Sequence, residues 1–166
     1  MAKFSNVISK ILDIEKGYTN DSDDAGGETK FGISKRQYPN LDISNLTQDA
    51  ALQIYERDFW NAHKLSNIDD QEIANKIFIL IVNMNAIEAI KLVQHALVDC
   101  GVATNNDIDG IMGSRTIDML NSLESMETGL FLNWLFTEEI THYVDEVYCD
   151  HSQIKYIRGW TKRALS

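Results

Sequence analysis

A scarcity of proline most restricts what this chain can fold into. Its 166 residues include one proline, Pro39, and nine glycines. Because proline interrupts helices and both residues mark turns, such a chain accommodates long helices more readily than a sandwich of many short strands. The length is enough for one domain or for two small lobes around a shared core. We therefore expect a mainly α fold.

The clearest helical pattern lies at the start of the chain. Apolar residues recur there at spacings of three and four, which predicts one helix from about residue 3 to 16. The stripe consists of Phe4, Val7, Ile8, Ile11 and Leu12, and it ends at Glu15. We expect the carboxyl group of Glu15 to lie partly against apolar surface, where the helix dipole does not favour its ionised form.

A glycine-rich stretch follows this first helix. Residues 16–33 contain four glycines and four acidic residues, which break the helical periodicity. Short extended pieces joined by tight turns fit this composition best. The sequence therefore predicts a small hairpin or loop region directly after the first helix.

The remainder of the chain is dominated by helical patterns. Thr47 is a suitable N-cap for a helix that carries Ala51, Ile54, Tyr55 and Phe59. Further helices are expected at residues 71–84, 86–99 with Gly101 as C-cap, 114–122 and 127–149. A loop over residues 105–113 is the best candidate divide between two lobes.

Three polar residues around the glycine-rich turn suit the hydrolysis of a glycosidic bond. That reaction needs one carboxylic acid that protonates the leaving oxygen and a second group that activates water or attacks the sugar. Glu15 at an apolar edge and Asp24 in a wet loop have the different environments that these roles require. Thr29 can hold the water, while Gly26 and Gly27 allow a close approach of the backbone to the sugar. On spacing alone, a solvated corner is the more frequent meaning of such a pattern.

The same residues carry a family resemblance. Glu15-Lys-Gly-Tyr18, then Asp24-Ala-Gly-Gly-Glu-Thr29 and Phe31-Gly-Ile33 resemble the signature of the glycoside hydrolase family 108 muramidases, Glu-Gly-Gly-Tyr, Asp-x-Gly-Gly-x-Thr and x-x-Gly-Ile. Lys16, Ile79 and Asn85 depart from the family pattern, which puts contacts of the second helix with substrate in doubt. The resemblance implies Glu15 as catalytic acid, Asp24 and Thr29 as its supporting pair, and a lysozyme-like helical fold. Tyr18, close behind Glu15, is a candidate lining residue of the cleft, together with Gly26 and Gly27.

Later motifs extend the resemblance along the chain. Val82-Asn83 followed by Leu92, Gln94 and Leu97 is similar to the family's Val-Asn and Leu-Gln-x-x-Leu. Asp109-Gly-x-x-Gly113-x-x-Thr116 and Gly159-Trp-x-x-Arg163 look like its C-terminal peptidoglycan-binding part. We therefore predict a catalytic region at about 1–100 and a helical peptidoglycan-binding region at 101–166, packed against it.

The function implied is hydrolysis of the β-1,4 bond between N-acetylmuramic acid and N-acetylglucosamine, with no metal and no cofactor. Water activated by Asp24 and Thr29 would make the reaction inverting; a bond from Asp24 to the sugar would make it retaining. Two alternatives stay open. The chain could be a non-catalytic peptidoglycan-binding module, or a wall hydrolase that cuts peptide stems.

Charge and hydropathy bear on partners and location. A net charge of -10 disfavours nucleic-acid binding, and it also disfavours association with an anionic cell wall. No segment reaches the roughly 20 apolar residues of a membrane span, and the N-terminus does not resemble a signal peptide. We expect synthesis in the cytoplasm and action at the periplasm or wall as a monomer, after export by a holin-like membrane protein or a specialised system, in phage lysis or protein release.

Several other residues invite secondary interpretations. Loops beginning at Asp21 and Asn105 resemble calcium loops, but the twelfth position of each lacks the required glutamate. The four histidines lack metal-ligand spacing, and Cys100 and Cys149 are expected to be reduced. Three tryptophans are candidate sugar platforms, although core packing is favoured for Trp134 and attachment of the C-terminus for Trp160. The third is Trp60.

Overall fold

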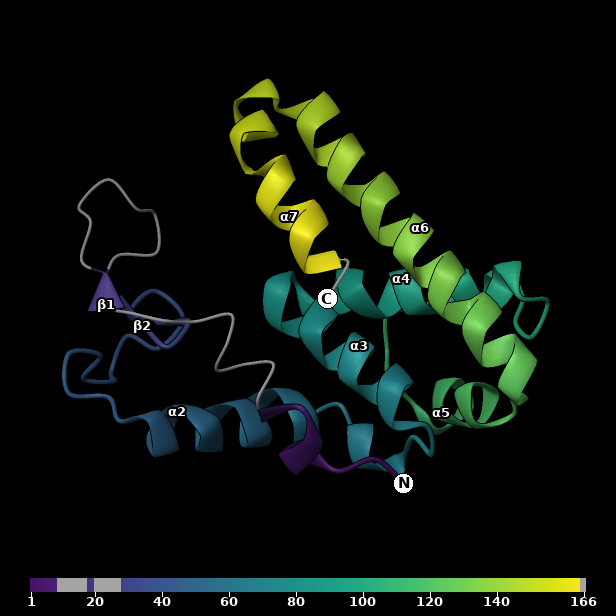
Figure 1. The fold of residues 1–166 in the computed structure, drawn as a ribbon, viewed down its shortest axis with the longest axis horizontal. Coiled ribbons are helices and arrows are strands. Elements are labelled where there is room, and N and C mark those ends of the chain that lie inside the picture. Colours follow the sequence, from purple (N-terminus) through teal and green to yellow (C-terminus); the bar gives the residue numbers. More distant parts are fainter. Residues whose placement is uncertain (9–17, 20–27, 165–166) are drawn as a thin grey trace. The chain divides into compact units, whose positions relative to one another are not determined.

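The computed structural model describes residues 1–8, 18–19 and 28–164 of the chain (Figure 1). These residues form two compact units, Met1–Asn75 and Lys76–Ser166, each of which is described by itself. The structure is mainly helical with one small sheet, which confirms the predicted fold class. Among the helices of these ranges, none combines the length and apolar character that a bilayer crossing requires.

The first unit opens with a short 3-10 helix, η1 (Phe4–Asn6), within the range of the predicted first helix. Residues 9–16 of that prediction lie outside the described residues. The Gln71 amide fixes the segment, since it accepts from the Lys3 N–H at 2.8 Å and donates to the Lys3 carbonyl at 3.1 Å. Phe4 is buried and meets the Trp60 ring edge-on at 5.8 Å between centroids. These contacts attach the N-terminal segment to the core of the first unit, with Ala2, Phe4 and Val7 buried.

A three-stranded antiparallel sheet follows in the order β1-β2-β3. Its strands are β1 (Tyr18–Thr19), β2 (Thr29–Lys30) and β3 (Ile33–Ser34). A two-residue turn joins the last two strands, and both of its residues have positive φ, 51° at Phe31 and 72° at Gly32. That geometry matches the right-handed twist of a hairpin. The predicted hairpin in the glycine-rich region is therefore confirmed.

The helix α2 (Gln48–Tyr55) carries the apolar core of the first unit. The Thr47 hydroxyl accepts from the Ala50 N–H at 3.3 Å, as the predicted N-cap requires. The chain then widens into a π-helix, η2 (Glu56–Asn61), before the 3-10 helix η3 (Leu65–Asn67). The wider turn lets Tyr55, Phe59 and Trp60 all face the interior.

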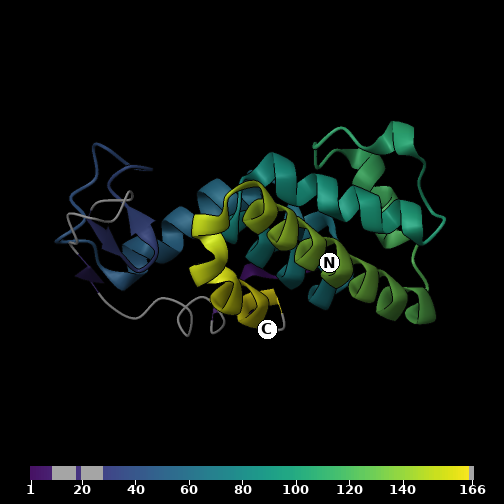
Figure 2. The same cartoon turned by 90° about the horizontal axis from the view of Figure 1, so that it is seen from above.

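The second unit is a helical assembly. The helix α3 (Gln71–Asn83) begins in the first unit and ends in the second. It is followed by α4 (Ala86–Asp99), η4 (Asn105–Asp107), α5 (Ser114–Asn121), α6 (Ser125–Cys149), η5 (His151–Tyr156) and α7 (Ile157–Ala164). The long α6 packs along α4, and α7 returns along α6 (Figures 1 and 2). The helices predicted from residue 71 onward lie within about two residues of these bounds.

A buried ion pair and a ring contact tie α3, α6 and α7 together. Lys76 Nζ lies 2.9 Å from Glu139 Oε2, and the Glu139 side chain is fully buried. Tyr143 donates its hydroxyl hydrogen to Glu139 Oε1 at 2.8 Å, and Lys76 also donates to the Ala164 carbonyl of α7. The Trp160 ring lies against Tyr143 at 5.2 Å, so Trp160 attaches the C-terminal helix as expected.

The other two tryptophans differ in their exposure to solvent. Trp60 is 1% exposed and donates its indole N–H to Ser66 Oγ at 2.7 Å, so it is a core residue. Trp134 is 37% exposed, and the expectation of core packing was wrong. In α6 it lies beside the buried face that Phe131 and Leu135 form, both of which are fully buried. Cys100 and Cys149 are free thiols, as expected.

Candidate functional site

The residues predicted to catalyse or bind substrate divide between described and undescribed parts of the chain. Glu15, Asp24, Gly26 and Gly27 lie outside the described residues. The backbone of Tyr18 lies in β1, where it pairs with Lys30. Thr29 is the residue before Lys30 in β2, and it pairs with Thr19. The sheet thus brings the backbones of the two described candidates, Tyr18 and Thr29, onto neighbouring strands.

Thr29 occupies the middle strand, between partners that also bear hydroxyl groups. The register places it opposite Thr19 in β1 and Ser34 in β3. Thr29 itself is half-buried. Ile33, one residue before Ser34, is 1% exposed and points into the core. Because successive side chains alternate across a sheet, Thr29 and Ser34 lie on the face opposite to that of Ile33. A threonine held there suits the positioning of a small polar reactant.

The turn at Phe31–Gly32 is held from outside the sheet. Tyr55, 1% exposed at the end of α2, donates its hydroxyl hydrogen to the Phe31 carbonyl at 2.9 Å. Lys30 Nζ donates to the Ser44 carbonyl at 2.7 Å, which fixes the strand to the loop that follows the sheet. The position of Thr29 therefore depends on α2 and on this loop as well as on strand pairing.

A charged cluster connects the same loop to the π-helix. Arg57 makes two bonds to the Asp58 carboxylate, at 2.6 and 2.7 Å, and these bonds lower the pKa of Asp58. Tyr38 donates to Asp58 Oδ2 at 2.9 Å. Burial and this hydrogen bond to the carboxylate raise the pKa of Tyr38 to about 12. Tyr38 therefore stays protonated as a donor throughout the neutral range and ties the loop to η2.

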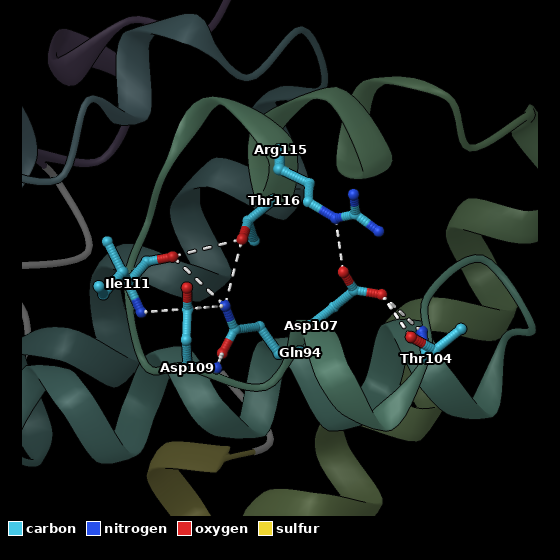
Figure 3. A network of polar contacts seen from close by, with 7 residues as sticks. All are labelled: Gln94, Thr104, Asp107, Asp109, Ile111, Arg115 and Thr116. Carbon is cyan, nitrogen blue, oxygen red and sulfur yellow. Dashed lines mark hydrogen bonds and ion pairs between the residues drawn. The ribbon is translucent and has the colours of Figure 1, made fainter.

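In the second unit, one glutamine organises the Asp-Gly-x-x-Gly-x-x-Thr motif (Figure 3). Gln94 of α4 is fully buried. Its Oε1 accepts from the backbone N–H groups of Asp109 and Gly110 at 3.0 and 2.8 Å. Its Nε2 donates to Asp109 Oδ1 at 2.7 Å, to Thr116 Oγ1 at 3.2 Å and to the Ile111 carbonyl at 3.3 Å. The motif is therefore a loop folded around one amide side chain.

The two carboxylates of this loop are both held by protein donors. Asp107 accepts from the Thr104 N–H at 2.9 Å and forms an ion pair with Arg115. The Thr104 backbone bond and the Arg115 bond lower the pKa of Asp107 to about 2. Asp109 accepts from Gln94 and from the Ile111 N–H, and these bonds lower the pKa of Asp109 as well.

These contacts bear on the calcium interpretation. At the Asn105 loop, the Gln94 amide nitrogen engages the Asp109, Ile111 and Thr116 oxygens, which a cation would need as ligands. Across the described ranges, no group of three His, Cys, Asp or Glu side chains is arranged to hold a metal ion. The Asp21 loop lies outside those ranges. The structure therefore gives no support to a cation at the Asn105 loop.

Sequence reasoning missed two of these supporting residues. The sequence indicated Gln94 only as part of the Leu-Gln-x-x-Leu family pattern. It indicated Tyr55 only as an apolar position of a predicted helix. Their partners lie 15 to 24 residues away along the chain. A polar residue inside an apolar helical stripe was the one available signal for Gln94, because a buried amide needs partners.

Comparisons with known proteins place this architecture in a class. The fold is similar to that of SagA from Brucella abortus, with a TM-score of 0.71, 17% sequence identity, and coverage of 98% of this chain and 93% of that chain. At that identity the likeness concerns the fold. Among curated proteins, no sequence matches the chain.

Family models then divide the sequence into two parts. Residues 8–84 match the family model described as glycosyl hydrolase 108, and residues 88–165 match the model described as predicted peptidoglycan domain. The chain is therefore a glycoside hydrolase directed at peptidoglycan, and the suspected family is confirmed. The family bounds and the two compact units both divide the chain before the approximate boundary predicted near residue 100.

Proposed function

We propose that this protein is an N-acetylmuramidase that hydrolyses the β-1,4 bond between N-acetylmuramic acid and N-acetylglucosamine. The observation that carries the proposal is the family 108 match over residues 8–84, which contain Glu15, Asp24 and Thr29. The match over residues 88–165 supports peptidoglycan as the polymer to which the second unit binds.

In the proposed reaction Glu15 is the general acid. Its proton passes to the glycosidic oxygen as the bond to the anomeric carbon breaks. Asp24 accepts a proton from a water molecule, whose oxygen attacks the anomeric carbon. Thr29 orients that water through its hydroxyl group, from a strand fixed on both sides by pairing. With water as the attacking group, the product has the inverted configuration.

Release of reducing ends from purified peptidoglycan tests this function. Glu15→Gln keeps the size of the side chain and removes the acid, so we expect the rate to fall by about a hundredfold or more. The exposed Glu72 of the same unit supplies the control, and Glu72→Gln should digest at the parent rate. If Glu15→Gln also digests at the parent rate, the assignment of the acid is wrong.

Product analysis separates the alternatives. Mass spectrometry of the fragments should show muramic acid at the new reducing ends, and NMR of fresh product should show the inverted anomer. Cleaved peptide stems would identify a different hydrolase, and a retained anomer would make Asp24 the nucleophile. Binding to the wall without any released fragment would identify a non-catalytic module.

The biological setting that we propose is release across the bacterial envelope. The protein would be made in the cytoplasm and would act as a monomer on the wall, after a holin-like membrane protein or a specialised system admits it. Co-expression of the chain with a holin tests this directly. Lysis should require both proteins, and lysis by the chain alone would overturn the requirement.

A further inference from the structure

The hairpin that carries Thr29 contains a backbone conformation that is unfavourable for its residue. Phe31 has a φ of 51°, in the left-handed region that glycine adopts readily and phenylalanine adopts rarely. Each of the three strands has two residues, so strand pairing alone gives little stability. An outside contact is needed to keep this turn in place.

Tyr55 supplies such a contact from the core of the first unit. Its ring is buried and lies against Phe59 at 5.5 Å between centroids, so the hydroxyl group has a fixed position. From there it donates to the Phe31 carbonyl at 2.9 Å, across 24 residues of sequence. The bond joins the rigid end of α2 to the turn, two residues beyond Thr29.

We propose that Tyr55 is a positioning residue for the hydrolysis. Its hydroxyl group holds the Phe31–Gly32 turn and thereby sets where Thr29 places the attacking water. This inference rests on the function proposed above for Thr29. Small displacements of a group that positions a reactant reduce the rate more than they reduce stability. Loss of the Tyr55 hydroxyl should therefore impair turnover in a protein that is still folded.

Tyr55→Phe removes the hydroxyl group and keeps the ring in the core. We expect kcat to fall about tenfold, with KM changed less than about twofold. Tyr143→Phe is the matched control, because Tyr143 is also buried and donates a 2.8 Å bond, but to Glu139 in the second unit. It should lower the melting temperature and leave kcat at the parent value. An equal fall of kcat in both variants would indicate a general stability effect and would overturn the inference.

A double-mutant cycle tests whether Tyr55 acts through Thr29. If it does, Tyr55→Phe should cause little further loss of kcat in a Thr29→Ala background. Multiplied losses would overturn the inference. A parent that releases no reducing ends would instead overturn the proposed function. Full activity of Thr29→Ala would remove the role of Thr29, and the role of Tyr55 with it.

A rescue experiment tests the turn itself. Phe31→Asn gives the pair Asn-Gly, which favours positive φ at both turn positions. In the Tyr55→Phe background this change should recover most of the lost kcat, and it also protects the hairpin if Tyr55→Phe loosens it. Amide hydrogen exchange at Lys30 and Ile33 should rise in Tyr55→Phe and fall again in the double variant. Unchanged exchange in Tyr55→Phe would show that the bond does not hold the turn.

Discussion

At the scale of the residue, three glycines of this chain differ in backbone conformation and in the space around them. Gly110 has a φ of 73°, and an added Cβ would lie 2.7 Å from Ile87 Cγ2 and 3.3 Å from the Ile87 carbonyl oxygen. Gly101 has a φ of 74° with open space around it. Gly129 lies in α6, also with open space. Conformation and packing can therefore be tested separately.

Alanine at these three positions should give three different results. Gly110→Ala combines an unfavourable φ with a close contact and should destabilise the protein by about 3 kcal/mol. Gly101→Ala meets only the unfavourable φ and should cost about 1 kcal/mol. Gly129→Ala should stabilise by up to about 1 kcal/mol, because alanine favours a helix. Urea unfolding of the three variants checks this order, and similar losses at Gly110 and Gly101 would contradict it.

The Asp-Gly-x-x-Gly-x-x-Thr motif of the second unit depends on Gln94. Gln94→Leu leaves the N–H groups of Asp109 and Gly110 without their acceptor inside the protein, so we expect a loss of about 3 kcal/mol or more. Gln94→Glu keeps an acceptor but places a second carboxylate beside Asp109. Repulsion and burial would raise the pKa of the introduced acid in the folded state, so this variant should recover stability as the pH falls from 7 to 5. Unfolding at both pH values tests the difference, and Gln94→Leu should show no such recovery.

At the scale of the element, end-capping side chains fix where several helices begin. Thr47 caps α2, and Asn85 caps α4 by accepting from the Ile87 N–H at 2.9 Å. Thr104 and Asp107 form a reciprocal capping box on η4, and Arg115 of α5 binds the same Asp107 carboxylate. One carboxylate therefore joins two neighbouring elements, η4 and α5.

This junction should be sensitive to acid. The folded pKa of Asp107 is about 2, below the value of about 3.9 for an unfolded aspartate. Its contribution to stability is therefore complete above about pH 4 and is lost as the pH falls toward 2. Asp107→Asn should flatten the pH dependence of the unfolding free energy over this interval, and Arg115→Gln should flatten it partly. An unchanged slope in Asp107→Asn would show that other groups govern the acid response.

At the scale of the whole molecule, each unit has its own means of cohesion. The first unit relies on the core of α2 and η2 and on hydrogen bonds that reach the small sheet. In the second unit, Lys76 and Glu139 form an ion pair that is largely shielded from solvent. Their side chains are 13% and 0% exposed. Such a pair costs desolvation, but removal of one partner leaves a buried charge uncompensated.

Removal of Lys76 alone should therefore be worse than removal of both charges. Lys76→Met should destabilise the protein by about 3–5 kcal/mol. Adding Glu139→Leu should recover most of that loss, because the unpaired carboxylate disappears. Thermal unfolding followed by circular dichroism measures both variants of the full chain. A double variant as unstable as Lys76→Met would mean that the bonds to Ala164 and Tyr143 are the larger contribution.

Much of the fold could be predicted because helices are local. The apolar spacing around Ile54 and Tyr55 and that of residues 86–99 record positions three and four apart, and Thr47 marks a beginning through its own hydroxyl group. The candidate site was predictable only as far as its motif. The letters around Glu15 and Thr29 indicate the chemistry, whereas the role of each residue in the reaction stays a prediction.

By itself, the sequence determined the mainly helical class, most helix bounds, the hairpin and the family. Tertiary structure decided that Tyr55 holds the Phe31 turn and that Gln94 forms the hydrogen bonds inside the Asp-Gly-x-x-Gly-x-x-Thr loop. It also decided that Trp134 is exposed. The reason is physical: periodicity shows that a helix has an apolar face, but it does not identify the polar group that lies against that face. Such partners depend on how distant segments pack, because a buried donor is stable only where an acceptor from elsewhere in the chain meets it.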